Sequence, residues 1–244
     1  MQIDATGLDA RTLNERVREA LTAGAEELVL NNVCGHRYIG AGLVTAARMT
    51  VNGTPGNDLG CFMEGARLIV RGNVQDGVAN TMSSGEIIVH GRAGDVLGYA
   101  MRGGRVLVRG DAGYRVGIHM KAYENCVPVI VIGGGAGDYL GEYMAGGMLV
   151  VLGLGREQGR PLVGRCFGTG MHGGEIFVRG SVGEDRLGRE VGAVAMDDEA
   201  WDRLAPHLAD FAREFGVDPA LLGPERFTRL VPVSHRPYGK IYAY

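Results

Sequence analysis

One short pattern of hydrophobic and polar residues recurs along most of the chain. The segment Met63–Gly72 reads MEGARLIVRG, and matching segments begin 19 residues later at Met82 and again at Met101. With breaks, the pattern gives seven units, which start at residues 44, 63, 82, 101, 120, 144 and 171. A unit this short cannot bury a hydrophobic face alone, so the units must stack into a solenoid. No helical period runs inside the unit, and the leucine-rich pattern L-x-x-L-x-L-x-x-N is absent.

Fixed positions inside the unit predict a parallel β-helix. The first position forms a column of mostly unbranched side chains, which suits interior packing: Val44, Met63, Met82, Met101, Met120, Met144 and Met171. The eighth forms a column of valines, typical of stacked parallel strands: Val51, Val70, Val89, Val108, Val151 and Val178. The tenth forms a column of glycines, expected at corners that need a positive φ or a close backbone approach: Gly53, Gly72, Gly91, Gly110, Gly153 and Gly180. Valine at position 110 would then strain φ.

Helical patterns flank the repeat. Leu13, Val17 and Leu21 share one face of a helix predicted over 10–23 and closed by Gly24. Near the other end, apolar residues at helical spacing follow a cap at Asp197 or Asp198: Trp201, Leu204, Leu208, Phe211 and Phe215. We expect Pro206 to restart this helix, Gly216 to end it, and Asp218-Pro219 to begin another short helix.

The repeat divides the chain into three parts. We expect an N-terminal strand and helix cap over 1–27, the β-helix over 28–195, and a C-terminal helical tail over 196–244. An open strand stack invites pairing with other chains, so a solenoid needs closed ends. The sequence therefore predicts an all-β solenoid with short helical caps at both ends.

The fifth, seventh and ninth positions of the unit share one outward face, because side chains alternate along a strand. The seventh forms an apolar stripe: Thr50, Ile69, Ile88, Leu107, Val150 and Phe177. Arginines at the fifth and ninth positions flank this stripe, an arrangement typical of a protein interface. The candidate interface residues are Arg48, Arg67, Arg71, Arg105, Arg109 and Arg179. The alternative is that the terminal helices of the same chain cover the stripe.

Composition narrows the function class. The formal net charge of the 244 residues is −3, which argues against nucleic-acid binding, and 45% hydrophobic residues argue against disorder. No apolar run is long enough to span a membrane, and Met1-Gln-Ile-Asp4 does not resemble a signal peptide. We expect a cytoplasmic protein. The four cysteines contain no C-x-x-C pair, so reduced and mostly buried thiols are expected: Cys34, Cys61, Cys126 and Cys166.

Residues that could carry chemistry have simpler interpretations here. Gly133–Gly137 lacks the Lys-Ser/Thr of a phosphate loop, and Gly168–Gly173 leads into a strand rather than a dinucleotide-binding helix. The six histidines occupy different phases of the repeat, so no metal site is predicted. Aspartates that follow the glycine corners, such as Asp95, Asp111 and Asp138, are expected to cap turns. No catalytic residue is predicted.

Several segments resemble the GXGXG domain at the C-terminus of the glutamate synthase large subunit. The closest are Gly91–Asp95, Gly133–Gly147 and Val150–Gly153. Upstream, Asn31 and Arg37-Tyr-Ile-Gly40 resemble another family segment, with a longer gap between Asn and Arg than the family has. The resemblance covers roughly 28–185, and the tail Ser234–Tyr242 looks like the stand-alone form, in which glutamate synthase is split over separate chains.

The resemblance implies a right-handed β-helix of about seven turns and a scaffold role. It implies a non-catalytic structural subunit of a multi-chain glutamate synthase, which makes glutamate from glutamine and 2-oxoglutarate. The implied partners are a class II glutamine amidotransferase subunit and a subunit that carries FMN and iron–sulfur clusters. No cofactor is expected in this chain.

Two alternatives stay open. The same scaffold could belong to N-methylglutamate synthase, or to a formylmethanofuran dehydrogenase or formyltransferase/hydrolase complex, which have related β-helix subunits. The chain could instead be an autonomous β-helix enzyme acting on a polysaccharide. Such enzymes display aromatic and acidic residues along a groove. With 7% aromatic residues and no aromatic ladder at the repeat positions, the sequence disfavours that reading.

Overall fold

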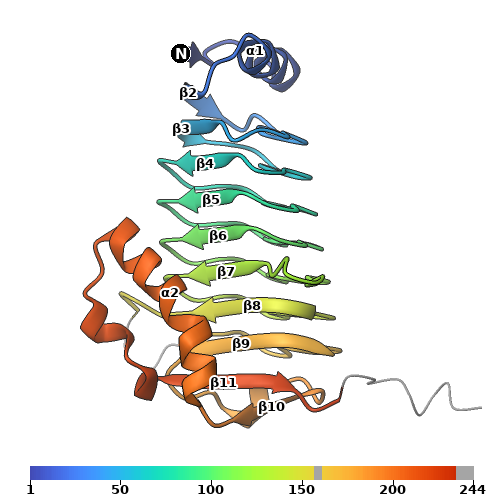
Figure 1. Cartoon of the computed structure of the whole chain (residues 1–244), viewed down its shortest axis with the longest axis vertical. Coiled ribbons are helices and arrows are strands. Elements are labelled where there is room, and N and C mark those ends of the chain that lie inside the picture. The colour runs from blue at the N-terminus through green and yellow to red at the C-terminus, as the bar shows by residue number, and fades with distance from the viewer. Residues whose placement is uncertain (157–160, 235–244) are drawn as a thin grey trace, which may run out of the picture.

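The computed structural model describes residues 1–156 and 161–234, which form a parallel β-helix (Figure 1). The tail segment that resembles the stand-alone form lies almost wholly outside these residues. The strands are β1 (Gln2–Asp4), β2 (Glu27–Cys34), β3 (Arg48–Thr54), β4 (Arg67–Val70), β5 (Glu86–Val89), β6 (Arg105–Val108), β7 (Val129–Ile132), β8 (Ala145–Val151), β9 (Gly173–Arg179), β10 (Val191–Val194) and β11 (Phe227–Pro232). The helices are α1 (Ala10–Thr22) and α2 (Asp198–Phe215), with short 3-10 helices η1 (Glu184–Arg186), η2 (Pro219–Leu222) and η3 (Pro224–Arg226).

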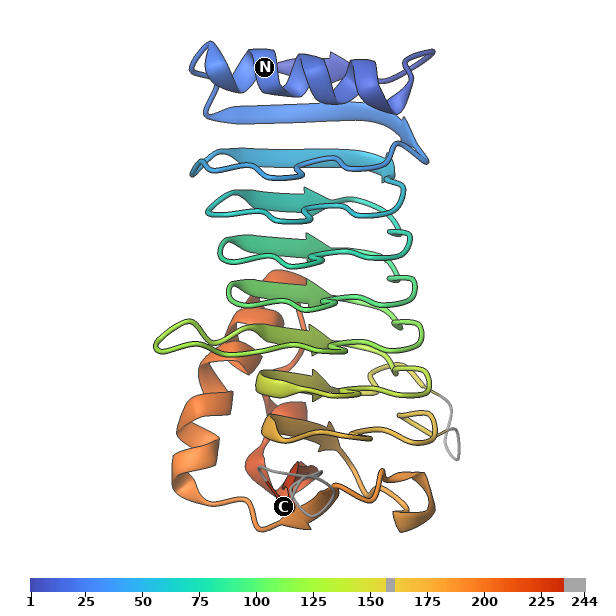
Figure 2. The ribbon, with the colours of Figure 1, turned by 90° about the vertical axis from the view of Figure 1, so that its right-hand side faces the viewer.

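The strands stack in chain order from β1 to β9, each parallel to the next, and the predicted solenoid is confirmed. Each repeat unit contributes one strand, β3 to β9. Equivalent residues of neighbouring units pair, as Arg67 does with Glu86 and Glu86 with Arg105. The first insertion falls between Met120 and Val129, so Arg105 pairs with Val129. Figure 2 shows the extra residues as a loop that protrudes just before β7.

The core runs along the inside of the solenoid. The six methionines from Met63 to Met171 that form the first-position column are fully buried there. The first unit departs from the predicted register. Val44 is 76% exposed, and Leu43 is the buried residue that lies in the methionine column. The chain between Leu43 and Met49 is therefore one residue longer than in later units, and Val44 is displaced outward.

The tenth-position glycines are needed for two different reasons. Gly53, Gly153 and Gly180 have positive φ angles of 124°, 60° and 122°. Gly110 does not, so the expected φ strain at that residue is wrong. A Cβ atom on Gly110 would instead lie 2.9 Å from the carbonyl oxygen of Gly91 on the preceding coil. Backbone crowding between coils therefore excludes a side chain at Gly110.

Helix α1 closes the N-terminal end. It begins after Asp9, whose side chain accepts the N–H of Thr12, and it buries Leu13 and Val17, as the spacing predicts. His36 holds this cap in place. Its Nε2 lies 2.9 Å from the carbonyl oxygen of Leu8, and its Nδ1 accepts the N–H of Cys34 at 3.1 Å. The ring therefore joins the segment before α1 to the end of β2.

Helix α2 lies along the side of the solenoid, across the C-terminal strands (Figures 1 and 2). It is continuous from Asp198 to Phe215, so the expected restart at Pro206 is wrong. Pro206 is exposed, and water can satisfy the carbonyl that its missing N–H leaves unpaired. Gly216 ends the helix in the left-handed conformation with φ 66°, and Asp218 caps η2, as predicted.

The tail also contributes to the sheet. Strand β11 pairs antiparallel with β9, and β10 pairs antiparallel with β11 at the edge. This change of direction ends the parallel stack at the C-terminal end. The division of the chain at residues 27/28 and 195/196 stays a prediction.

Candidate functional site

The outward apolar stripe of the sheet is covered by the chain's own C-terminal segment. Ile69, Ile88, Leu107, Val150 and Phe177 are all buried. They form one cluster with the apolar side of α2, η2 and β11: Ala200, Leu204, Leu208, Phe211, Ala212, Leu222 and Phe227. The structure thus follows the second of the two sequence-based alternatives over β4 to β9. That the six arginines contact another chain remains a prediction.

Two of the six arginines bind α2. Nη2 of Arg67 lies 3.4 Å from Glu214, and Arg105 forms an ion pair with Asp210. Glu86 lies between these arginines in the sheet and pairs with both. Acidic residues of α2 and β5 thus separate guanidinium groups that would otherwise repel across adjacent coils.

Arg179 has a different environment. Its Nε donates to the carbonyl oxygen of Leu152 at 2.5 Å, and Nη2 donates to that of Gly153 at 3.4 Å. Burial and the charge of Arg226, which lines the same open cavity, lower the pKa of Arg179. The side chain therefore binds backbone of the preceding coil rather than a carboxylate.

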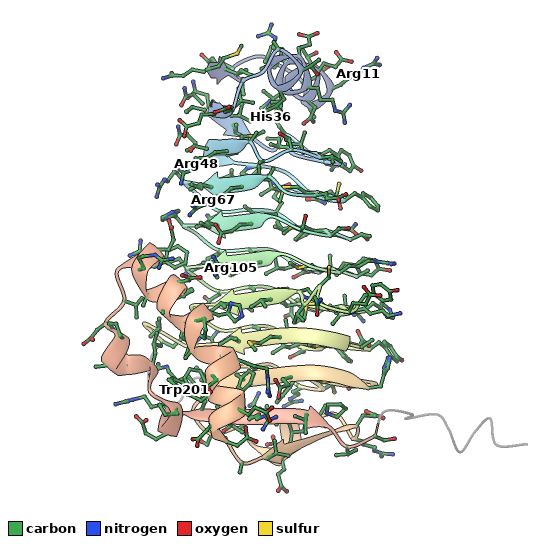
Figure 3. All side chains as sticks on the ribbon, viewed as in Figure 1. Arg11, His36, Arg48, Arg67, Arg105 and Trp201 are labelled. Carbon is green, nitrogen blue, oxygen red and sulfur yellow. The ribbon has the colours of Figure 1, made fainter. Side chains whose placement is uncertain are left out.

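The remaining three arginines are exposed, and their charges are poorly neutralised. Nη1 of Arg48 lies 3.9 Å from Glu27, and both side chains are solvated. Nη1 of Arg71 lies 2.7 Å from Nε2 of His90. Neither Arg71 nor Arg109 has a carboxylate of the described chain within 4 Å. Arg48 lies beyond the end of α2, where no helix covers the outer face of the sheet (Figure 3). Arg71 lies next to the last turn of α2, because its partner His90 contacts Glu214 and Phe215.

His90 lies between these cations and the end of α2. Arginine only donates, so Nε2 of His90 must accept from Arg71, which requires an unprotonated nitrogen. Burial and the nearby charge of Arg71 lower the pKa of His90, in agreement. Its ring packs edge-on against Phe215 at 5.2 Å between centroids. His90 is thus a packing contact for α2; its Nε2 also lies 3.4 Å from Oε1 of Glu214, whose charge opposes the lowering of the pKa.

Aspartates at the corners bind the next coil. Oδ1 of Asp76 accepts the N–H of Asp95, 19 residues on, at 2.8 Å. The same bond at 2.8 Å joins Tyr114 to Asp95, Gly135 to Asp111 and Arg165 to Asp138. These side chains were expected to cap turns, and each caps a turn of the neighbouring coil. The carboxylates are therefore part of the scaffold.

Large aromatic side chains lie exposed in the turn segments just before the first-position residues (Leu43, Met63, Met101 and Met120), and we call the surface formed by these segments the glycine-corner face. Tyr38, Phe62, Tyr99 and Tyr114 are 52%, 60%, 40% and 54% exposed. Among neighbouring coils, the ring of His119 stacks on Tyr143 at 5.4 Å and meets Tyr99 edge-on at 5.9 Å. These three rings form a short aromatic contact across neighbouring coils. Tyr99 and His119 occupy neighbouring phases of the repeat, so the periodicity of the sequence did not predict this contact.

The cysteines differ from expectation. All four are free thiols. Cys34, Cys126 and Cys166 are exposed and only Cys61 is buried, so the prediction that most of the thiols are buried is wrong. Burial, with the charge of Asp58, raises the pKa of Cys61 to about 11. Within residues 1–156 and 161–234, no group of three or more histidine, cysteine, aspartate or glutamate side chains is placed to hold a metal ion. None of the helices described there is long and apolar enough to cross a membrane.

Comparison with known families decides the identity of the repeat. Residues 22–222 match the family described as the GXGXG motif. The chain belongs to the GXGXG motif family. The match covers the β-helix and α2, and the predicted family is confirmed.

The chain is similar to the uncharacterised protein MJ1350 of Methanocaldococcus jannaschii. It is 43% identical over 249 residues, which cover 98% of this chain and 95% of the relative. Among solved structures, a similar chain occurs in the formyltransferase/hydrolase complex FhcABCD of Methylorubrum extorquens, determined with methylofuran. The TM-score is 0.61 at 22% identity, over 91% of this chain and 86% of that chain. At this identity the likeness shows a shared fold.

The repeat predicts the positions of the strand residues but not the contacts that α2 makes with them. Periodicity predicts the columns of the strand, since these residues repeat in register. It does not predict that acidic residues of α2 bind Arg67 and Arg105, because Asp210 and Glu214 lie outside the repeat. The acidic residues that accompany the apolar residues along α2 were the feature of the sequence that could have predicted these ion pairs.

Proposed function

We propose that this chain is a non-catalytic structural subunit of a multi-chain glutamate synthase. It would hold together a class II glutamine amidotransferase subunit and a subunit that carries FMN and iron–sulfur clusters, so that glutamine and 2-oxoglutarate are converted to glutamate by its partners. Membership of the GXGXG family supports a scaffold of this kind. The resemblance of Gly133–Gly147 and Val150–Gly153 to the glutamate synthase domain supports this enzyme. A cytoplasmic location, where exposed thiols stay reduced, fits the free cysteines.

The observation that carries the scaffold role is the exposed aromatic row. Tyr38, Phe62, Tyr99 and Tyr114 lie in the equivalent turn segments of four coils, although nearly all other large apolar side chains of the β-helix are buried. Tyrosine and other aromatic residues are enriched in protein interfaces. Three carboxylates of the same face, those of Asp76, Asp95 and Asp138, already accept backbone N–H groups. This face therefore suits contact with another chain better than catalysis.

The experiment is purification of the tagged chain from its native host. We expect flavin and iron–sulfur absorbance and co-purifying amidotransferase and FMN-binding chains. The double variant Tyr99→Ser/Tyr114→Ser should recover less of these chains, and Val194→Ser on β10 is the control because Val194 is exposed at the far end. Glutamine-dependent glutamate formation by the complex, absent from the isolated chain, completes the test. A chain that purifies alone, or one that is active alone, contradicts the proposal.

A second candidate keeps the scaffold role and changes the enzyme. The similar fold in the formyltransferase/hydrolase complex of Methylorubrum extorquens favours a β-helix subunit of a one-carbon complex. N-methylglutamate synthase is a further enzyme of this group. The same purification separates the candidates, because the co-purifying chains would then be those of a formyl-transferring or methylamine-utilising enzyme.

A further inference from the structure

Helix α2 covers only part of the outer face of the sheet. Its apolar cluster ends at Ile69 on β4. Figure 1 shows no helix over the outer side of β2 and β3. The outward side chains there are only partly buried or exposed, and we call them the bare face: Glu27, Val29 and Asn31 of β2, Arg48, Thr50 and Asn52 of β3, and Arg71 beyond β4. The bare face is continuous with the surface that α2 occupies.

The docked helix shows what this type of surface binds. Leu208 and Phe211 of α2 lie in one buried cluster with the stripe residues Ile88 and Leu107. At the edges of the stripe, Asp210 pairs with Arg105 and Glu214 with Arg67. An apolar stripe flanked by arginines is thus matched by a helix whose apolar side is flanked by carboxylates.

The bare face repeats this arrangement without an occupant. Strand register places Val29, Thr50 and Ile69 side by side, and Glu27, Arg48 and Arg67 beside them. Arg48 meets Glu27 only at 3.9 Å, and Arg71 has His90 as its close partner, so two cations lack a well-placed carboxylate. Arg48 is paired in register with Arg67 on the adjacent coil, and cations stacked in this way repel, so a carboxylate placed beside Arg48 would relieve this repulsion.

We propose that the bare face binds an acidic amphipathic helix of a partner subunit, which continues the line of α2 toward the N-terminal end. Its apolar side packs on Val29 and Thr50, and its carboxylates pair with Arg48 and Arg71. The acidic helix of a second copy is a poorer occupant, because α2 of each copy is already held on its own sheet by two ion pairs and a buried apolar cluster. The inference rests on the proposed role as a subunit and names the surface and chemistry of one contact.

The test uses the full-length tagged chain expressed in its native host, with the photocrosslinking residue benzoylphenylalanine at position 50. The same residue at position 114, on the glycine-corner face, is the positional control. In parallel, Arg48→Glu/Arg71→Glu is compared with Arg11→Glu/Arg102→Glu, which makes the same charge change at exposed residues elsewhere. Melting curves of the purified variants show whether they are folded. The crosslinking variant keeps Arg48 and Arg71, so its result does not depend on how the charge-reversal variant folds.

We expect position 50 to crosslink to an acidic helical segment of a co-purifying chain. Charge reversal at Arg48 and Arg71 should reduce recovery of that chain at least about tenfold, with the control variant unaffected. The inference is overturned if partner chains co-purify but position 50 crosslinks to none of them, to a second copy, or to a segment without acidic residues. It is also overturned if the folded charge-reversal variant retains the partner. Acidic-segment crosslinks to chains other than amidotransferase and FMN-binding subunits overturn only the glutamate synthase assignment, and a chain that purifies alone overturns both.

Discussion

A methyl group on Gly98 would lie 2.3 Å from Cδ1 of Ile130, which belongs to a strand two coils further along the stack. The same relationship recurs inside the solenoid, between Gly117 and Leu149 and between Gly141 and Ile176. Ala79 occupies the equivalent place in its coil, with φ 59°, and the residue two coils on is Val106, one carbon smaller. Corner glycines and large strand residues are therefore matched across the core.

Gly98→Ala should destabilise the fold. The left-handed φ of 71° costs an alanine about 1–2 kcal/mol, and crowding against Ile130 adds about 1–3 kcal/mol. Ile130→Val in the same chain copies the Ala79 and Val106 arrangement and should recover part of the crowding cost. Chemical denaturation of the four proteins of this double-mutant cycle measures the coupling. Additive losses, with no recovery in the double variant, would show that the two residues do not share space.

Glu175→Gln should loosen the N-terminal half of α2. Oε1 of Glu175 lies 2.6 Å from Nη2 of Arg229 and 3.0 Å from Nη2 of Arg203, so one carboxylate joins β9, β11 and α2. Its side chain and that of Arg229 are 17% and 14% exposed, so loss of the charge should cost about 1–3 kcal/mol. Faster hydrogen exchange in α2 and β11 is the readout. Arg11→Gln, which breaks an exposed pair with Glu15, is the control and should change stability by less than about 0.5 kcal/mol.

Three of the four cysteines should react with a thiol reagent in the folded chain, and one should not. Cys34, Cys126 and Cys166 are exposed, whereas Cys61 is buried and its pKa is raised to about 11, so little thiolate forms at pH 8. A colorimetric disulfide reagent should titrate three thiols in the folded chain and four in denaturant. Cys61→Ala should leave the folded count at three. Rapid reaction of a fourth thiol in the folded protein would contradict the placement of Cys61.

The strand columns could be predicted from sequence because the period reports directly on stacking. Met63 to Met171 are buried as the pattern requires, since a residue repeated in register must meet its equivalents. Val44 was misplaced because one extra residue shifts the phase without altering the local pattern, and Leu43 fits the column equally well.

The surface was harder to predict, because it depends on segments outside the repeat. The sequence identified the arginine-flanked stripe but left open whether this chain or another covers it. That choice depends on the path of α2, which tertiary packing sets. Pro206 gave a misleading local signal, since burial of Leu204, Leu208 and Phe211 outweighs the loss of one helical hydrogen bond.

Stability should fall as the pH drops from 7.5 through 6.5, partly because of His207. Burial and the charge of Arg105 lower the pKa of His207, whose Nδ1 is buried without a hydrogen-bond partner, while Asp210 opposes the shift. The unfolded chain, with a histidine pKa near 6.5, then binds more protons than the folded chain between the two pKa values, so stability rises with pH in that window. Melting temperatures at pH 7.5 and 5.5 measure the loss. His207→Leu should reduce the difference between the two temperatures, and the exposed His119→Leu is the control. An unchanged difference in His207→Leu would show that other groups, such as His90, carry the pH dependence.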